Sequence, residues 1–410
     1  MNKNTIHFQM DADRDLIAPE VLSQRILKIC AQAPITVDPS ERPHLNLALV
    51  LDRSGSMSGE KLNYVKQAAQ HVLNLLQEQD SVAIVAYDDE INLLSPGARV
   101  TSSQRTELIR RISQLEPGGM TNLSGGWLAG CKEVASAAQE GTINRTLLLT
   151  DGLANAGIVD LEELAQQSKE LSKRGVSTST FGVGEGFNEH LLEAMSNQGG
   201  GNFYYIGTPK EIPDLFLREF KELAAVTARE VEITLDFPPQ LKLQVPGGWR
   251  TEFSAGRLHI FLGNLFSGQT QEIYIRLISP PTDNLSELVL NANVSGKGEN
   301  GLRFENQAQI IIRYADQTKV EAAPQKREIM EHFALVYLAE ITTEALKVER
   351  QGERDEASRL LMDVIEEYRE YVNPDEVVKY SRTTERMARG MAEADRKQTH
   401  SAAYRDKRSK

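Results

Sequence analysis

Cysteine is nearly absent from this 410-residue chain, which contains only Cys30 and Cys131. Two cysteines cannot form the disulfide framework of a small secreted domain, and they are too few for a zinc site built from thiolates. Apolar runs are short, and none approaches the roughly eighteen residues that a membrane-spanning helix requires. The N-terminal segment carries charges where a signal peptide needs an apolar run. We therefore expect a reduced, soluble, cytoplasmic protein with no membrane span.

A net positive charge is also missing, because 46 lysines and arginines stand against 58 aspartates and glutamates, for a formal net charge of −12. Proteins that coat nucleic acid or anionic membranes neutralise phosphates with clustered lysine and arginine. The acidic balance therefore argues against nucleic acid as a partner. Hydrophobic residues make up 40% of the chain, which is ordinary for a globular protein with a sizeable core and one to three domains.

Short apolar runs alternate with segments of helical periodicity over residues 43–226. The run over residues 45–52 is almost continuously apolar, and the run over residues 145–150 has three consecutive leucines at its centre, as in strands covered on both faces. This alternation predicts a doubly wound, Rossmann-like α/β domain with a mostly parallel sheet. Ligands of such sheets bind beyond the carboxyl ends of the strands, so the loops that follow the strands are the places to search for a site.

The pattern changes after this region. Residues 227–318 contain short strands with period-two alternation and turn signals, which predicts a β-sandwich. Residues 1–42 contain further strand candidates, and we expect them to join that sandwich because they are too few to form a domain. Apolar residues at helical spacing indicate a helical bundle over residues 325–396. The segment 397–410 is rich in lysine and arginine, and we expect a frayed basic tail, with docking of an acidic partner as the alternative.

The most informative loop follows the first apolar run, where Asp52, Ser54 and Ser56 stand at alternate positions. Gly55 and Gly59 relax the backbone there. Carboxylate, hydroxyl and water oxygens are hard ligands that suit Mg²⁺, which keeps several waters and few protein carboxylates. The same hydroxyls could instead cap the helix that follows. Taken alone, this string leaves both a metal site and a capping loop open.

Two further loops favour the metal site. Thr121 precedes a predicted helix and supplies another hydroxyl, and Asp151 follows the apolar run over residues 145–150 and supplies another carboxylate. All three loops are expected at the carboxyl-end edge of the sheet. Oxygen ligands from separate parts of the chain are therefore predicted to meet at one place.

The order D-x-S-x-S, then Thr, then T-D-G resembles the metal-ion-dependent adhesion site of the von Willebrand factor type A (vWA) domain family. The segments LNLALVLDRSGSM, GGMTNL and LLLTDGLAN are similar to bacterial members, including those grouped with calcium-activated chloride channel-like and inter-α-trypsin-inhibitor-like proteins. The resemblance covers about residues 43–226. It implies a Mg²⁺ site, with Mn²⁺ or Ca²⁺ as substitutes, in which three residues bind through hydroxyls and two carboxylates bind directly or through water. The five matching residues are Asp52, Ser54, Ser56, Thr121 and Asp151.

These features together predict a metal-dependent protein-interaction module and not an enzyme. Two carboxylates offset the charge of the dication, so the ion keeps an electrophilic position toward solvent that an Asp or Glu of a partner protein can fill. The alternative is a regulatory vWA subunit of an ATPase or of a metal-chelatase-type assembly. A hydrolase with a metal-activated water is disfavoured because no general base is apparent.

Three other signals carry less weight. The glycine-rich segment 182–186 lacks the lysine and the spacing of a phosphate-binding loop, and we expect it, with Glu185, to form a wall of the partner site. The seven histidines show no paired spacing typical of metal ligands. We expect Asp88, Asp89 and Glu90 to form a solvated hairpin turn rather than a second metal site.

Overall fold

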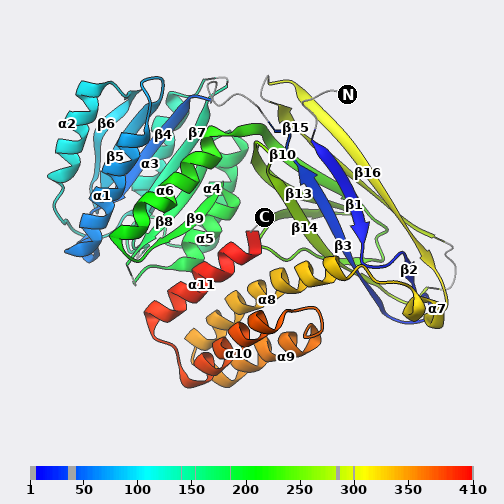
Figure 1. The fold of residues 1–410 in the computed structure, drawn as a ribbon. Helices are drawn as coiled ribbons and strands as arrows, with labels where there is room; N and C mark the ends of the chain where they lie inside the picture. The colour runs from blue at the N-terminus through cyan, green and yellow to red at the C-terminus, as the bar shows by residue number, and fades with distance from the viewer. Residues whose placement is uncertain are drawn as a thin grey trace. The chain divides into compact units, whose positions relative to one another are not determined.

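The computed structural model describes residues 6–35, 43–139, 141–152, 154–184, 186–282, 287–298 and 301–408 (Figure 1). The chain divides into two compact units. One unit consists of residues 37–226 with 299–301, and the other of residues 1–36, 227–298 and 302–410. Each unit has hydrophobic cores of its own, so each is described by itself.

The first unit is built on a six-stranded sheet with the strand order β6-β5-β4-β7-β8-β9. Its strands are β4 (Leu45–Asp52), β5 (Ser81–Tyr87), β6 (Ile91–Arg99), β7 (Ile143–Thr150), β8 (Ser177–Val183) and β9 (Gly200–Ile206). All neighbours pair in parallel except β6, which lies antiparallel at one edge. The strand order reverses at β4, between β5 and β7. The predicted doubly wound, mostly parallel α/β sheet is therefore confirmed.

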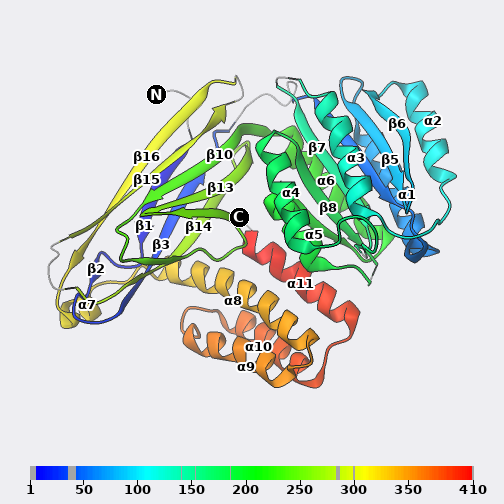
Figure 2. The same ribbon diagram turned by 180° about the vertical axis from the view of Figure 1, so that it is seen from behind.

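Helices cover both faces of this sheet (Figure 1 and Figure 2). The helices α1 (Glu60–Leu75), α2 (Ser102–Ser113) and α6 (Ile212–Ala224) share one core, and α3 (Leu123–Ser136), α4 (Leu161–Lys173) and α5 (Glu189–Gln198) share the other. The central strand explains this division, because Leu47 and Leu49 point into the first core whereas Ala48 and Val50 point into the second. Every residue of β4 is buried, as a strand covered on both faces requires.

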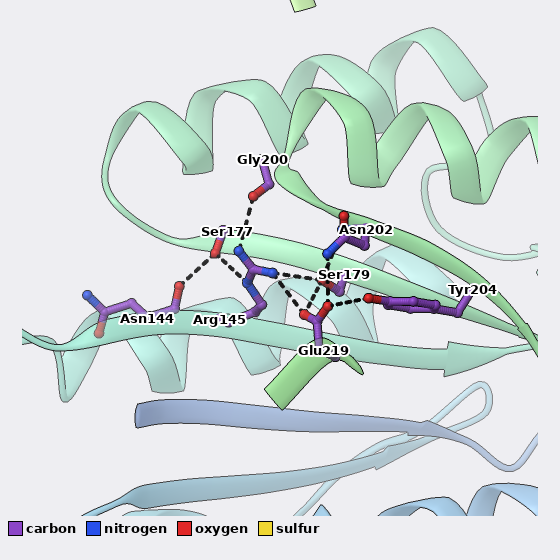
Figure 3. A network of polar contacts seen from close by, with 8 residues as sticks. All are labelled: Asn144, Arg145, Ser177, Ser179, Gly200, Asn202, Tyr204 and Glu219. Atoms are coloured by element: carbon purple, nitrogen blue, oxygen red, sulfur yellow. Dashed lines mark hydrogen bonds and ion pairs between the residues drawn. The ribbon is translucent and has the colours of Figure 1, made fainter. Parts of the chain in front are cut away.

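A buried ion pair fastens α6 to the sheet (Figure 3). The carboxylate of Glu219 accepts hydrogen bonds from Arg145 at 2.8 Å and Ser179 at 2.6 Å, and from Tyr204 at 2.9 Å and Asn202 at 3.0 Å. Burial opposes ionisation of Glu219, but the Arg145 guanidinium and these hydrogen bonds outweigh it and lower the pKa of the carboxyl group. The ion pair between Glu219 and Arg145 thus holds α6, the last helix of the unit, against the sheet.

The second unit contains a β-sandwich with strands from both sides of the α/β unit in the sequence. Its two sheets have the orders β1-β3-β14-β11 and β12-β13-β10-β15-β16-β2. The strands are β1 (His7–Ala12), β2 (Leu16–Ile17), β3 (Ser23–Gln32), β10 (Val226–Asp236), β11 (Lys242–Gln244), β12 (Arg250–Ser254), β13 (Arg257–Phe266), β14 (Thr270–Ser279), β15 (Glu287–Gly298) and β16 (Arg303–Tyr314). Because β3 pairs along its whole length with β14, the N-terminal strands lie within the sandwich.

In the described part of the chain, five helices follow the sandwich, namely α7 (Gln317–Ala322), α8 (Arg327–Arg350), α9 (Arg354–Glu367), α10 (Pro374–Arg389) and α11 (Glu393–Arg408). The interpretation of residues 397–410 as a frayed tail is wrong as far as Arg408, because this segment belongs to α11. Arg396 holds the helix by donating to the buried carboxylate of Glu349 at 2.9 Å. Residues 409 and 410 lie outside the described part. Among the described helices, none is both long and apolar enough to cross a membrane.

Candidate metal site

The candidate ligands lie at the carboxyl-end edge of the α/β sheet. Asp52 is the last residue of β4, and Asp151 directly follows the neighbouring strand β7. The parallel register pairs Leu51 with Leu149, so the ends of the two strands that carry Asp52 and Asp151 lie next to each other. Thr121 lies in the connection between α2 and α3. This edge is also where the strand order reverses, which is the usual location of a ligand site in such sheets.

Asp52 is fully buried, and the residues around it hold its carboxylate in place. Its Oδ1 accepts a hydrogen bond from the backbone N–H of Ser54 at 2.9 Å, and its Oδ2 accepts from the hydroxyls of Thr150 at 2.5 Å and Tyr87 at 3.2 Å. Burial raises the pKa of Asp52, the hydrogen bonds from Ser54 and Thr150 offset part of that effect, and the charge of Asp151 adds to it. A cation beside these two carboxylates would favour their ionised forms.

Asp151 is also fully buried, and its two oxygens have different surroundings. Oδ2 accepts a hydrogen bond from the ammonium group of Lys61 at 2.9 Å. Oδ1 is buried, and no described group forms a hydrogen bond with it. A buried carboxylate oxygen that lacks a partner costs free energy and in native proteins marks the place of an ion or a water molecule. The Oδ1 atom of Asp151 is therefore a suitable ligand for a cation at this edge.

The three hydroxyls come from two loops that are joined by backbone hydrogen bonds. Ser54 is buried and Ser56 is exposed, and their Oγ atoms lie 3.2 Å apart. The N–H of Gly55 donates to the carbonyl of Gly119 at 2.8 Å, two residues before Thr121. Thr121 is buried as well. The loop after β4 and the loop before α3 are thus held against each other, as a shared site requires.

The alternative of a capping loop finds no support in this geometry. The short 3₁₀ helix η2 (Gly55–Met57) has Ser54 at its N-cap, but the serine side chain makes no capping hydrogen bond. The helix α1 begins after Gly59, which has no side chain to cap it. The hydroxyls of Ser54 and Ser56 instead lie beside each other and are available as oxygen ligands. With two carboxylates and three hydroxyls, the donor set is the hard-oxygen type that suits Mg²⁺.

Asp88 differs from the expectation of a solvated turn. Its side chain is buried, whereas Asp89 and Glu90 are exposed. The Oδ2 atom of Asp88 pairs with the guanidinium of Arg53 at 3.1 Å and accepts from the N–H of Gly119 at 3.3 Å. The prediction is wrong for Asp88 because the two hydroxyl-bearing loops cover it. A signal was present in the sequence, since this acid directly follows a buried strand.

Like Asp88, Lys61 lies beside the candidate site, and the sequence analysis did not identify it. It lies in the first turn of α1, and its ammonium group reaches Asp151 from there. The stem of Lys61 passes close to Gly184, where an added Cβ atom would lie 2.9 Å from its Cε. Gly184 therefore borders the same region, whereas Glu185 lies outside the described residues, and a wall of a partner site formed by this segment stays a prediction. The signal for Lys61 was a cation shortly after the D-x-S-x-S loop.

Comparison with known sequences agrees with this architecture. The chain is 32% identical over 215 residues to the uncharacterized protein YfbK of Escherichia coli strain K12 and 30% identical over 234 residues to the uncharacterized protein sll0103 of Synechocystis. It is 28% identical over 162 residues to human inter-alpha-trypsin inhibitor heavy chain H3. The alignments cover 52%, 57% and 38% of this chain but 36%, 54% and 18% of these relatives. The chain thus spans about half or less of the length of the curated relatives it matches.

Two solved structures share the fold over nearly the whole chain. A von Willebrand factor type A protein from Catenulispora acidiphila has a TM-score of 0.74 at 16% identity and covers 98% of this chain, which covers 97% of that one. The ArnB paralog VWA2 from Sulfolobus acidocaldarius has a TM-score of 0.65 at 16% identity, with coverages of 99% and 98%. At such low identity these likenesses show the fold alone. The von Willebrand factor type A domain family itself matches residues 46–218, and the chain therefore contains a vWA domain, as the resemblance of its motifs predicted.

Proposed function

We propose that the vWA domain of this chain binds Mg²⁺ at the edge of its sheet and, through the bound ion, a carboxylate of a partner protein. vWA domains commonly act as protein-interaction modules, and the metal would make the interaction conditional. The observation that carries the proposal is the buried, unpartnered Oδ1 atom of Asp151 beside the buried carboxylate of Asp52. Such an arrangement is costly in a folded protein unless a cation is present.

The ion would be held by the carboxylates and hydroxyls of five residues: Asp52, Ser54, Ser56, Thr121 and Asp151. When bound, it supplies a Lewis-acidic position for a further oxygen ligand. Tyr87 and Thr150 orient the carboxylate of Asp52 through their hydroxyls. Ser56 is exposed, and so is Met120, at 57% of its full exposure, so a partner can approach the site from solvent and make apolar contact beside it.

The proposed role is binding without a catalytic step. We also propose a cytoplasmic location, which fits the two free and buried cysteines, Cys30 and Cys131. Neither part of the proposal depends on the sandwich or on the C-terminal helices.

Isothermal titration calorimetry with Mg²⁺ tests the metal part of the proposal. The wild-type chain is expected to bind one ion, and Asp151→Asn, which keeps the shape of the side chain, is expected to bind at least about tenfold more weakly. Asp89→Asn serves as the matched control, because it removes an exposed charge next to the site and should leave the affinity unchanged. Absence of binding to the wild type, or equal affinity in Asp151→Asn, would contradict the proposal.

A further inference from the structure

Lys61 brings a positive charge into a site that is proposed to hold a cation. Its Nζ atom lies 2.9 Å from Oδ2 of Asp151, whose side chain is completely buried, while the lysine side chain keeps 26% of its exposure. The close approach to Gly184 shows that the lysine stem lies against the neighbouring loop. The contact is therefore a partly buried ion pair, in which the screening by solvent is weaker than at the surface.

The charges around the site show what this ion pair does in the absence of a metal. Asp52 and Asp151 are two completely buried carboxylates at the ends of neighbouring strands. The nearby guanidinium of Arg53 forms its ion pair with Asp88 and not with either of these carboxylates. Among the described residues, Lys61 is the cation that forms an ion pair with one of these two carboxylates, that of Asp151. Without it, two uncompensated charges would be buried together, which is strongly destabilising.

A bound dication changes this balance. Two carboxylates and a dication alone would be neutral, whereas Lys61 adds one positive charge to the set. In the empty site Lys61 reduces the net charge of the two carboxylates from −2 to −1, so the site attracts the metal less strongly, and in the loaded site it raises the net charge from zero to +1, so an anionic ligand is attracted more strongly. The lysine therefore has opposite effects on the two binding steps.

We propose that Lys61 is a built-in counter-ion of the site, which stabilises it without metal, competes with the metal for Asp151, and gives the loaded site the net positive charge that selects an anionic partner group. This inference rests on the proposed function, since it concerns the same site. It assigns a specificity role to a residue outside the ligand set. The metal ligands provide the position for the carboxylate, and Lys61 sets how strongly that position attracts it.

The test compares Lys61→Met with the wild type, and with Lys66→Met as the matched control. Lys66 lies on the same helix and donates to the carbonyl of Ser113 at the surface, so its loss removes the same charge without touching the site. Three quantities are measured on the full chain. They are the midpoint of thermal unfolding without metal, the Mg²⁺ affinity by calorimetry, and the affinity of the Mg²⁺-saturated protein for N-acetyl-aspartate amide by NMR titration.

For Lys61→Met we expect a lower unfolding midpoint without metal, about tenfold tighter Mg²⁺ binding, and several-fold weaker binding of the aspartate probe. Lys66→Met should match the wild type in all three. Should Lys61→Met fail to fold without metal, added Mg²⁺ is expected to restore its cooperative unfolding, and failure to do so would overturn the inference. Mg²⁺ binding by Lys61→Met that is equal to or weaker than that of Lys66→Met would also overturn it.

The outcomes separate this inference from the proposed function. If the wild type binds no Mg²⁺ but Lys61→Met does, the proposed function fails for the native chain while the competition by Lys61 is supported. If the wild type binds Mg²⁺ and the lysine variant gains nothing, the proposed function stands and the inference fails. If neither protein binds Mg²⁺, both are overturned.

Discussion

The guanidinium of Arg53 lies 3.1 Å from the carboxylate of Asp88, and this ion pair joins the D-x-S-x-S loop to the turn that follows β5. Arg53 stands between Asp52 and Ser54, whereas Asp88 also accepts from Gly119 and, through its backbone carbonyl, from Asn122. Asp88 thus links the D-x-S-x-S loop to the loop of Thr121 without contributing a ligand. These contacts hold the ligand-bearing loops against each other, so we expect the affinity of the proposed site to depend on them as well as on the ligands.

Replacement of Asp88 tests this dependence. We expect Asp88→Ala to lower the free energy of unfolding by about 2 kcal/mol, because it leaves Arg53 and the N–H of Gly119 without their charged acceptor. Mg²⁺ affinity should fall as well, although every ligand is still present. Urea unfolding and calorimetry measure the two effects. Asp89→Ala is the control, and equal behaviour of the two variants would show that Asp88 does not hold the loops.

The close approach of Gly118 to Asp88 gives a second prediction. A Cβ atom at Gly118 would lie 1.6 Å from Oδ2 of Asp88, so Gly118→Ala must displace the loop or the carboxylate. The expected cost is about 1–3 kcal/mol in the free energy of unfolding, together with weaker Mg²⁺ binding. Gly97→Ala is a matched control, since the nearest atom to its added Cβ would lie at 3.6 Å. If Gly118→Ala lowers the free energy of unfolding no more than Gly97→Ala does, the tight packing of the loop against Asp88 is contradicted.

The network of Figure 3 gives a prediction about stability. Glu219→Gln leaves the guanidinium of Arg145 buried without its counter-ion, and we expect it to lower the free energy of unfolding by about 3–5 kcal/mol. Glu219→Leu combined with Arg145→Met should cost less than the sum of the two single changes, because it leaves no unpaired charge. Chemical denaturation of the wild type, Glu219→Leu, Arg145→Met and the double variant measures the coupling between the two side chains. Strict additivity would show that the two side chains do not act as a pair.

The lowered pKa of Glu219 also predicts a pH dependence. The folded protein releases the proton of Glu219 more readily than the unfolded chain, whose reference pKa is 4.5. The stabilisation is therefore complete above the unfolded pKa and is lost as the pH falls through the lower pKa of the folded state. Unfolding free energies measured between neutral pH and acid should fall less steeply in Glu219→Gln than in the wild type. Parallel curves would contradict the assigned pKa shift.

The elements of the α/β domain could be predicted because their signals are local. A strand covered on both faces is rich in apolar residues, and the sequence shows this along most of β4 and in the three consecutive leucines of β7. The strand ends then place Asp52 and Asp151 at one edge of the sheet without any knowledge of tertiary contacts. Their assignment as metal ligands is still a prediction, which the titrations above would test.

The residues that were missed depend on partners far away in the sequence. Lys61 pairs with a carboxylate 90 residues later, and Arg396 pairs with one 47 residues earlier. A basic segment such as α11 looks solvated when its acidic partners are unknown. Asp88 looks like part of a polar turn for the same reason, since its burial arises from Arg53 and from the glycines at positions 118 and 119.

The central claim is that a metal ion at Asp52 and Asp151 controls the capture of a protein partner. Its most direct test immobilises the full chain, incubates it with cell extract in Mg²⁺, and identifies the retained proteins by mass spectrometry before and after EDTA. We predict a partner that the wild type and Asp89→Asn retain in Mg²⁺ and release in EDTA, and that Asp151→Asn does not retain. Retention of the same proteins by all three chains regardless of EDTA would contradict the account.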